Sequence, residues 1–410
     1  MKKKRTALLL ALALLLTLTG CGARSAEPAE PAEPTAAPTE APAADGPADG
    51  IDEELAAAVE AQTQAIVDTV KRVRATYDPD QVVCTVDGSE VTWNMYYYFI
   101  VKELEEYIYY VGALPEDYSM LIADGTTLED YLKQVTLAQS SYYTVTANKA
   151  RELGAELSPE SEAAIQEYWD YLATANGGEA ALLESLLESC LDKGLYLAFL
   201  RGNEEQTNVM DELYGTGGEK LSDEDVISWA EEQGFIRIKH VLYFFYDDAG
   251  NPLDEEGKAE QLARAEATLA ELRALEGDPE ALEARFDEIM AADTGDAGGL
   301  SRFPDGYTFT AGTMYPVFEE AAFALENYQV SEITESQSGY HILLRLPLDP
   351  DGLTMDQDSN TGAYMTLRSS AANEIFIMQM AEWVKQAEVV WTEGFEDLDL
   401  NKLFGVGVEE

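Results

Sequence analysis

The segment from Ile236 to Leu346 constrains the fold most, because strand-like residues open and close it and helical residues lie between them. Ile236–Leu242 alternates between apolar and polar residues and then runs apolar, as a half-buried strand does. Tyr340–Leu346 forms the second predicted strand. Three helices are expected between the strands, over Glu255–Glu276, Pro279–Ala291 and Val317–Leu325. This order predicts a small α+β unit with one sheet.

The only two histidines of the chain, His240 and His341, lie in the two predicted strands. A histidine in a strand is more often a satisfied core residue than a catalytic one. Here, however, both histidines of the chain fall at the two ends of one small sheet, and this placement favours a shared functional role.

Short motifs across this segment resemble those of parvulins, a family of peptidyl-prolyl cis/trans isomerases. They occur in the family's order and cover the whole unit, so the resemblance predicts a parvulin-like domain over residues 235–347, an antiparallel sheet with surrounding helices. In chain order the motifs are Lys239–Leu242, Gly306–Met314, Phe318–Leu325, Val330–Ser331 and Ser338–Leu343.

Rotation about an X–Pro bond makes and breaks no covalent bond, and its barrier of about 18–20 kcal/mol comes from amide resonance. An enzyme for this step needs an apolar pocket that holds the proline ring and excludes water from the amide. The resemblance implies that Met314, Phe318 and Phe323 line this pocket and that Ser336 also binds substrate. It implies no cofactor and no metal ion.

The resemblance also implies a non-covalent catalytic network beneath the pocket. An aspartate in this network would bias the electrostatics of the substrate amide rather than attack it. The expected catalytic residues are His240, Asp293, His341 and Ser338. Two further carboxylates, Asp287 and Asp296, lie close to Asp293 in the sequence and remain alternatives to it.

Two departures from the family pattern bear on the function. Arg302–Gly306 replaces the family's G-G-D-L-G run, which leaves one apolar wall of the pocket open to question. The alternative function is therefore a catalytically silent holdase that binds unfolded exported chains. Tyr246-Asp247-Asp248 stands where a phosphate-selective parvulin would need cations, so ordinary, unphosphorylated X–Pro substrates are expected.

The first residues of the chain predict export. Positively charged Lys2–Arg5 precede an apolar run, Ala7–Leu16, that is too short to span a bilayer as a mature helix. The run closes on Leu18-Thr19-Gly20-Cys21, which resembles a lipoprotein lipobox. The resemblance implies a signal peptide over residues 1–20 and lipid on Cys21. The alternative is a plain secretory signal followed by an unrelated cysteine.

Residues 21–50 repeat Ala-Glu-Pro and have no apolar face, so they are expected to form a semi-rigid tether. A lipid anchor at Cys21 would hold the chain on the extracytoplasmic face of a bacterial cell membrane. The other two cysteines, Cys84 and Cys190, have no metal-ligand spacing and are expected to be small buried apolar residues.

The parvulin-like unit is flanked by a mostly helical region, residues 51–234, and by residues 348–410, which include a predicted helix over Tyr364–Ala387. This arrangement resembles PrsA-type foldase lipoproteins. The resemblance implies that the flanks pack together as a chaperone-like cradle for unfolded exported polypeptides with X–Pro bonds, and it suggests homodimers.

Within the helical region, the predicted helix Asn94–Val111 is rich in tyrosine. These rings either pack the helical core, which is the favoured interpretation, or bind unfolded segments. Because Tyr96, Tyr97 and Tyr98 point in three directions around a helix, some of them are expected to be exposed.

The formal net charge of −52 argues against nucleic acid as a partner and against docking onto anionic lipid headgroups. A lipid-anchored solute-binding protein would share the predicted anchor. That reading is disfavoured, because the sequence lacks the strand–helix alternation of a two-lobed α/β protein.

Overall fold

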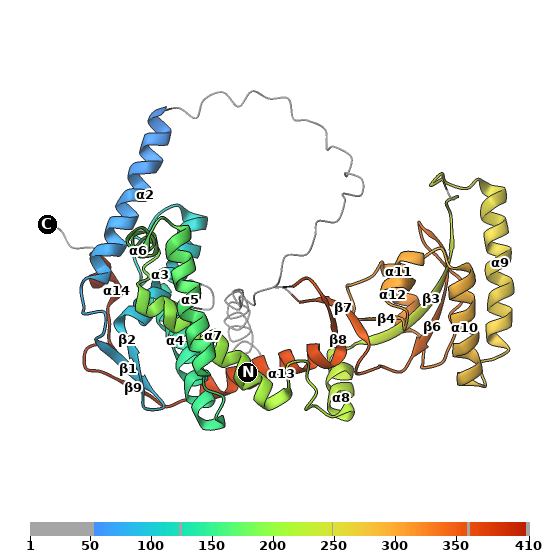
Figure 1. Cartoon of the computed structure of the whole chain (residues 1–410). Coiled ribbons are helices and arrows are strands. Elements are labelled where there is room, and N and C mark those ends of the chain that lie inside the picture. The colour runs from blue at the N-terminus through green and yellow to red at the C-terminus, as the bar shows by residue number, and fades with distance from the viewer. Residues whose placement is uncertain (1–52, 123–124, 248, 359–360, 407–410) are drawn as a thin grey trace. The chain divides into compact units, whose positions relative to one another are not determined.

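A computed structural model describes residues 53–122, 125–247, 249–358 and 361–406 (Figure 1). The predicted signal peptide, Cys21 and the tether lie outside the described residues. The chain divides into two compact units, one over Leu213–Ile377 and one that combines Met1–Glu212 with Met378–Glu410. None of the described helices is both long enough and apolar enough to cross a membrane.

The first unit is mostly helical, as predicted. Strand β1 pairs antiparallel with β2 on one side and with β9 on the other, although β9 lies some 300 residues further along the chain. The helices are α2 (Glu53–Arg74), α3 (Trp93–Val111), α4 (Leu128–Leu153), α5 (Pro159–Ala175), α6 (Glu179–Glu188), most of α7 (Lys193–Tyr214) and α14 (Leu400–Phe404), and the strands are β1 (Val82–Val86), β2 (Ser89–Thr92) and β9 (Val389–Trp391).

The tyrosine-rich helix α3 lies in the core of this unit. Tyr96, Tyr97 and Tyr98 are 1%, 0% and 8% exposed, so the expectation that some of them face solvent is wrong. The reason is that α3 has neighbours on several sides, and its rings contact α2, α7 and β9. The exposed tyrosines of α3 are Tyr109 and Tyr110, in its last turn.

The second unit has the predicted strand–helix–strand order and two further strands after it. Its elements are α8 (Asp223–Gln233), β3 (Ile236–Phe244), α9 (Glu255–Arg273), α10 (Pro279–Asp293), α11 (Ala297–Arg302), β4 (Tyr307–Phe309), α12 (Pro316–Phe323), β5 (Thr334–Glu335), β6 (Gly339–Leu346), β7 (Leu353–Gln357), β8 (Tyr364–Thr366) and the start of α13 (Leu367–Gln386). The predicted α+β fold class is therefore confirmed.

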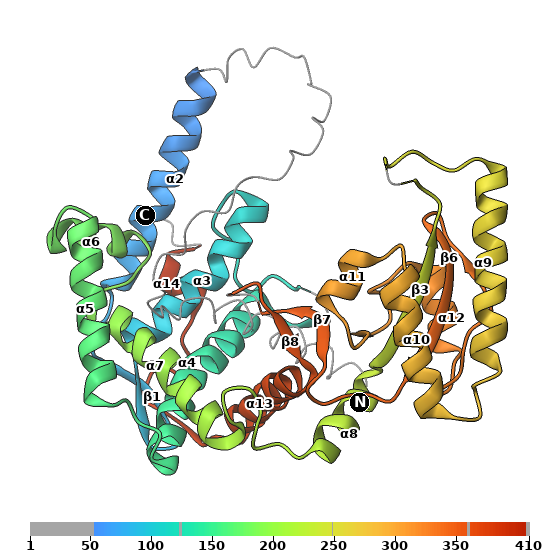
Figure 2. The same cartoon turned by 45° about the vertical axis from the view of Figure 1, so that its right-hand side comes forward.

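Six strands form one sheet in the order β5-β6-β3-β4-β7-β8. Helices α9 and α10 run beside each other on one face, where Val241 and Ile342 belong to the core (Figures 1 and 2). On the other face, α12 packs over a second core that includes Ile238 and Leu343. Because side chains along β3 and β6 alternate between the two faces, the sheet lies between two apolar layers.

An ion-pair cluster joins β3 to α10 on the first of these faces. Lys239 is only 3% exposed, and its Nζ lies 2.7 Å from Asp287 Oδ1 and 3.0 Å from Glu283 Oε1. A buried ammonium requires such partners. Asp287, one of the alternatives for the catalytic carboxylate, thus lies on the face opposite to His240.

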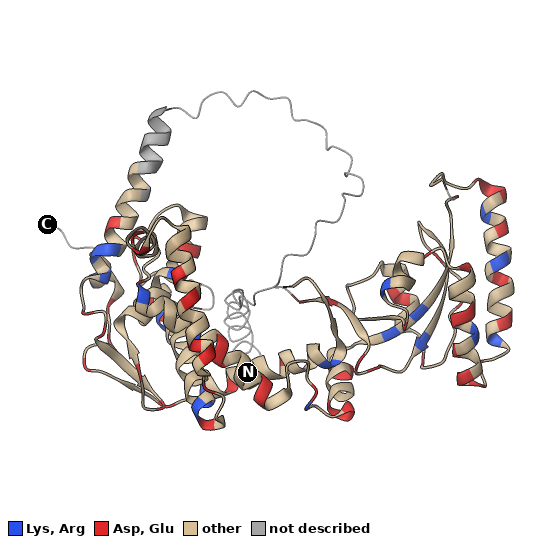
Figure 3. Ribbon diagram, viewed as in Figure 1, with Lys and Arg blue, Asp and Glu red and all other residues tan. Residues whose placement is uncertain are grey.

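Acidic side chains outnumber basic ones in both units, as Figure 3 shows. Many of the basic residues that are present pair with them, for example Arg285 with Glu271 and Glu288 in the second unit.

Candidate active site

The pairing of β3 with β6 brings the two histidines together. His240 lies opposite Leu343 and His341 lies opposite Leu242, so the imidazoles are diagonal neighbours on the α12 face of the sheet. Their Nδ1 atoms are 3.3 Å apart, and each residue is 7% exposed. Two residues that are distant in the sequence therefore form one buried pair.

The hydrogen bonds of this pair continue at both ends. His240 Nε2 lies 2.9 Å from Asp296 Oδ2, and an ionised carboxylate can only accept, so this nitrogen carries a proton. At the other end, His341 Nε2 lies 2.8 Å from Ser336 Oγ. The donor in this contact, and in the contact between the two Nδ1 atoms, depends on the tautomers of the rings.

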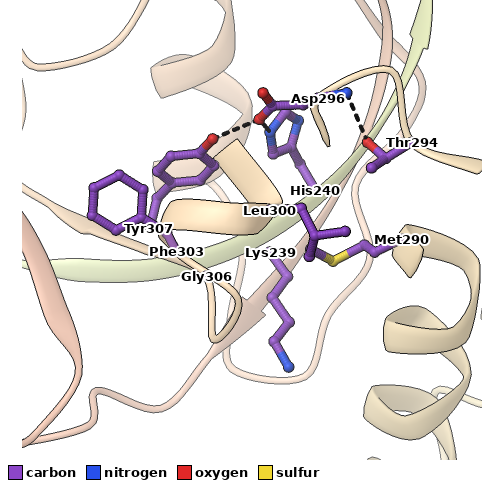
Figure 4. Close-up of a pocket in the computed structure, with 9 residues that line it drawn as sticks. All are labelled: Lys239, His240, Met290, Thr294, Asp296, Leu300, Phe303, Gly306 and Tyr307. Carbon is purple, nitrogen blue, oxygen red and sulfur yellow. Dashed lines mark hydrogen bonds and ion pairs between the residues drawn. The ribbon is translucent and has the colours of Figure 1, made fainter. Parts of the chain in front are cut away.

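Three hydrogen bonds hold the Asp296 carboxylate in place, and Figure 4 draws those to His240 and Tyr307. Besides His240, it accepts from the Tyr307 hydroxyl at 2.5 Å and from the Gly299 backbone N–H at 3.0 Å. The hydrogen bond from His240, supported by the one from Tyr307, holds the carboxyl pKa of Asp296 well below its ordinary value. Burial and then Asp296 itself raise the pKa of the Tyr307 hydroxyl. The site thus holds a carboxylate beside a neutral phenol.

The predicted position of Asp293 in this network is wrong. Asp293 is the last residue of α10, and its carboxylate pairs with Arg264 of α9. Asp296, the other alternative, is three residues further on, where the chain has left the helix and turned towards β3.

Of the two predicted serines, only Ser336 contacts the imidazole pair through its side chain. It is Ser336 whose hydroxyl contacts His341, whereas Ser338 takes part through its backbone. The Ser338 N–H donates to Ser336 Oγ at 3.0 Å, and its carbonyl accepts from the Phe245 N–H at 2.9 Å. Ser338 therefore helps to orient Ser336 rather than the imidazole.

Apolar residues cover the imidazole pair. The Phe318 ring stands perpendicular to both imidazoles, with centroids 5.3 Å from His240 and 5.6 Å from His341. Met314 packs half-buried in the same cluster. Phe323 is 37% exposed and reaches this cluster through Phe309, at a centroid distance of 6.1 Å. Phe318 therefore contacts both imidazoles, Met314 packs on the cluster that contains Phe318, and Phe323 is partly exposed beside Phe309.

Two more aromatic rings lie beside the pair, and one of them, Phe303, belongs to the run that departs from the family pattern. Phe303 packs on Tyr307 at 5.1 Å, and Tyr307 on His240 at 5.5 Å. These residues and Asp296 line a small hollow (Figure 4). Gly306 has a φ of 99°, and a Cβ there would lie 2.9 Å from the Ile238 carbonyl oxygen, so glycine is required. Tyr307 is the aromatic residue of the Gly306–Met314 motif, but the motif did not indicate its hydrogen bond to Asp296.

The burial of the pair also sets its protonation. Burial, and then the neighbouring imidazole of His240, lower the pKa of His341 to about 4. His341 therefore stays neutral near pH 7.

Comparison with known proteins identifies the class. Residues 240–346 match the family described as Rotamase, the PPIC-type PPIASE domain. The chain is 34% identical to the peptidyl-prolyl cis-trans isomerase Pin1 of Arabidopsis thaliana over 92 residues, which are 22% of this chain and 76% of that protein. The chain therefore belongs to the parvulin-type peptidyl-prolyl isomerases.

A longer similarity covers both units. The chain is 25% identical to the foldase protein PrsA of Oceanobacillus iheyensis over 304 residues, 65% of this chain and 94% of that protein. Among solved structures, PrsA from Bacillus subtilis is 18% identical, covers 70% of this chain and 99% of its own length, and gives a TM-score of 0.22. Because the similarity to the Oceanobacillus protein spans 65% of this chain, the parvulin domain is part of a chain that is PrsA-like over most of its length.

Proposed function

We propose that this parvulin-type isomerase acts through the network of His240, His341, Asp296 and Ser336. The observation that carries the proposal is the direct contact of the two imidazoles beneath Phe318. Each ring nitrogen has a partner, so the pair forms a rigid polar floor under an apolar ring.

The apolar cluster over this floor suits a proline ring. Phe318 and Met314 offer a polarizable surface that replaces water around the substrate amide. Amide resonance depends on separated charge, and an apolar surrounding stabilises that charge less than water does. The twisted amide, in which resonance is lost, is therefore favoured relative to the planar ground state.

Asp296 is proposed to act by its charge. Its side chain is 28% exposed, and it is kept ionised by its hydrogen bonds. A fixed negative charge near the substrate carbonyl opposes build-up of negative charge on that oxygen, and so opposes the planar resonance form. No covalent step is involved.

The proposed clients are unfolded exported polypeptides that contain X–Pro bonds without phosphate. Support comes from the similarity to PrsA foldases and from the lack of a cation cluster after β3, where Asp247 instead accepts hydrogen bonds from its own turn. The predicted lipid on Cys21 would place this activity on the extracytoplasmic face of the membrane, and the resemblance to PrsA-type proteins also suggests homodimers.

The decisive experiment is protease-coupled isomerisation of an Ala-Xaa-Pro-Phe tetrapeptide by the chain without residues 1–21. The expected result is a rate that rises linearly with enzyme concentration above the uncatalysed rate. A rate equal to the uncatalysed one, together with suppressed aggregation of an unfolded protein, would instead support the catalytically silent holdase.

A further inference from the structure

Two strands that follow the parvulin domain extend its sheet. β7 and β8 span Leu353–Thr366, beyond residues 240–346 that match the rotamase family. β7 pairs in parallel with β4, with Thr308 opposite Thr354, so the hairpin lies next to the strand that carries Tyr307 (Figures 1 and 2). The sheet therefore does not end at β4.

The register of this pair decides which β7 side chain faces the site. Paired residues share a face of the sheet, so Thr354 faces away with Thr308, and Met355 faces the same side as Tyr307 and Phe309. Met355 is half-buried and, like Met314, packs against the apolar cluster that contains Phe309 and Phe318. One residue of the hairpin thus packs on the same cluster as Phe318, whose ring covers the imidazoles.

The hairpin is fixed firmly enough to act as a wall. The Thr354 hydroxyl donates to the Met365 carbonyl at 3.1 Å, and the Leu367 N–H donates to the Gly352 carbonyl at 2.9 Å. Tyr364 of β8 packs its ring on Phe303 at a centroid distance of 4.8 Å. Phe303 lies in the run that replaces the family's pocket wall, so the hairpin supports the altered region directly.

We infer that Met355 is a specificity-determining residue of the isomerase site and that the β7–β8 hairpin supplies an apolar wall for a client residue next to proline. This inference rests on the proposed function. A half-buried methionine offers a flexible apolar surface that adapts to side chains of different shape. The favoured clients therefore carry a bulky apolar residue, such as leucine or phenylalanine, beside proline.

The test compares kcat/KM of the wild type, Met355→Ala and Met355→Leu for two peptide series. One series varies the residue before proline and the other the residue after it, each with alanine, leucine or phenylalanine. In one of the series, Met355→Ala is expected to lower kcat/KM about tenfold for peptides with leucine or phenylalanine and little for peptides with alanine. Met355→Leu is expected to keep the wild-type preference for the bulky residues. Met378, which is 58% exposed on α13, provides the matched control Met378→Ala, expected to behave as wild type.

The outcomes separate this inference from the proposed function. An active wild type whose preference is unchanged by Met355→Ala in both series would overturn the role of Met355 and leave the isomerase intact. A uniform loss for all peptides would also overturn it, because a merely structural role lowers every rate alike. An inactive wild type would instead overturn the proposed function.

Discussion

At the scale of single residues, Asp296 anchors one end of the hydrogen-bonded network in the site. Its carboxylate requires a proton on His240 Nε2, and the contacts continue through His341 to Ser336. The same carboxylate accepts from Tyr307, which directly follows the altered Arg302–Gly306 run.

Replacement of this carboxylate should therefore impair catalysis. Asp296→Asn removes the charge and is expected to lower kcat/KM about tenfold or more, because a hydrogen bond to a charged group contributes about 1.5–3 kcal/mol. Isomerisation kinetics measure the effect. Asp293→Asn is the matched control, since Asp293 pairs with Arg264 outside the network and should keep wild-type activity. Equal losses in both variants would contradict the assignment.

The neutral His341 should make the fold sensitive to acid. Its pKa is about 4 in the folded chain, against an ordinary value of 6.5, so between these values the unfolded state binds a proton that the folded state does not. The contribution of the neutral His341 ring to the free energy of unfolding is present above pH 6.5 and is lost as the pH drops towards 4. From pH 7 to pH 5 the loss is about 2 kcal/mol.

Urea denaturation at the two pH values measures this loss. His341→Asn, which has no titrating ring, should show a smaller decrease between pH 7 and pH 5 than the wild type. Identical decreases in the two proteins would mean that His341 does not carry this dependence.

At the scale of elements, periodicity predicted the strands and helices that frame the site to within a few residues. β3 and β6 pair as the motifs require, and α12 covers them. The sequence could not place Asp293 and Asp296, because their positions depend on where α10 ends and how the next turn folds. The region after Leu346 was interpreted as turns and one helix, so β7 and β8 were missed, and Tyr364 starts a strand rather than the predicted helix. Strands of only five and three residues, as β7 and β8 are, show no clear periodicity.

The link between β3 and α10 should depend on the Lys239 ion pairs. Lys239→Ala leaves Glu283 and Asp287 without their cation and is expected to destabilise the second unit by about 2 kcal/mol, since these carboxylates are only partly exposed. In Lys239→Met the two carboxylates lose their cation as well, but an apolar side chain of similar length still fills the buried position. This variant should therefore destabilise the second unit less. Thermal or urea unfolding of both variants tests this order, and a Lys239→Ala variant more stable than Lys239→Met would contradict it.

At the scale of the whole molecule, the predicted lipid anchor determines where the isomerase works. Cys21→Ala should abolish fatty-acid labelling of the chain in bacterial cells and release it from the membrane fraction, because the lipid would be its only covalent attachment. Cys84→Ala is the control, since Cys84 is a buried free thiol. Labelling that survives Cys21→Ala would contradict the anchor.

A double-mutant cycle on the two histidines tests the central claim most directly. His240→Asn and His341→Asn each leave a buried partner without its hydrogen bond, so each should lower kcat/KM for a proline tetrapeptide. If the two rings form one unit, the double variant is as active as the less active of the two single variants. Losses that multiply, or a wild type no faster than the uncatalysed reaction, would contradict the account.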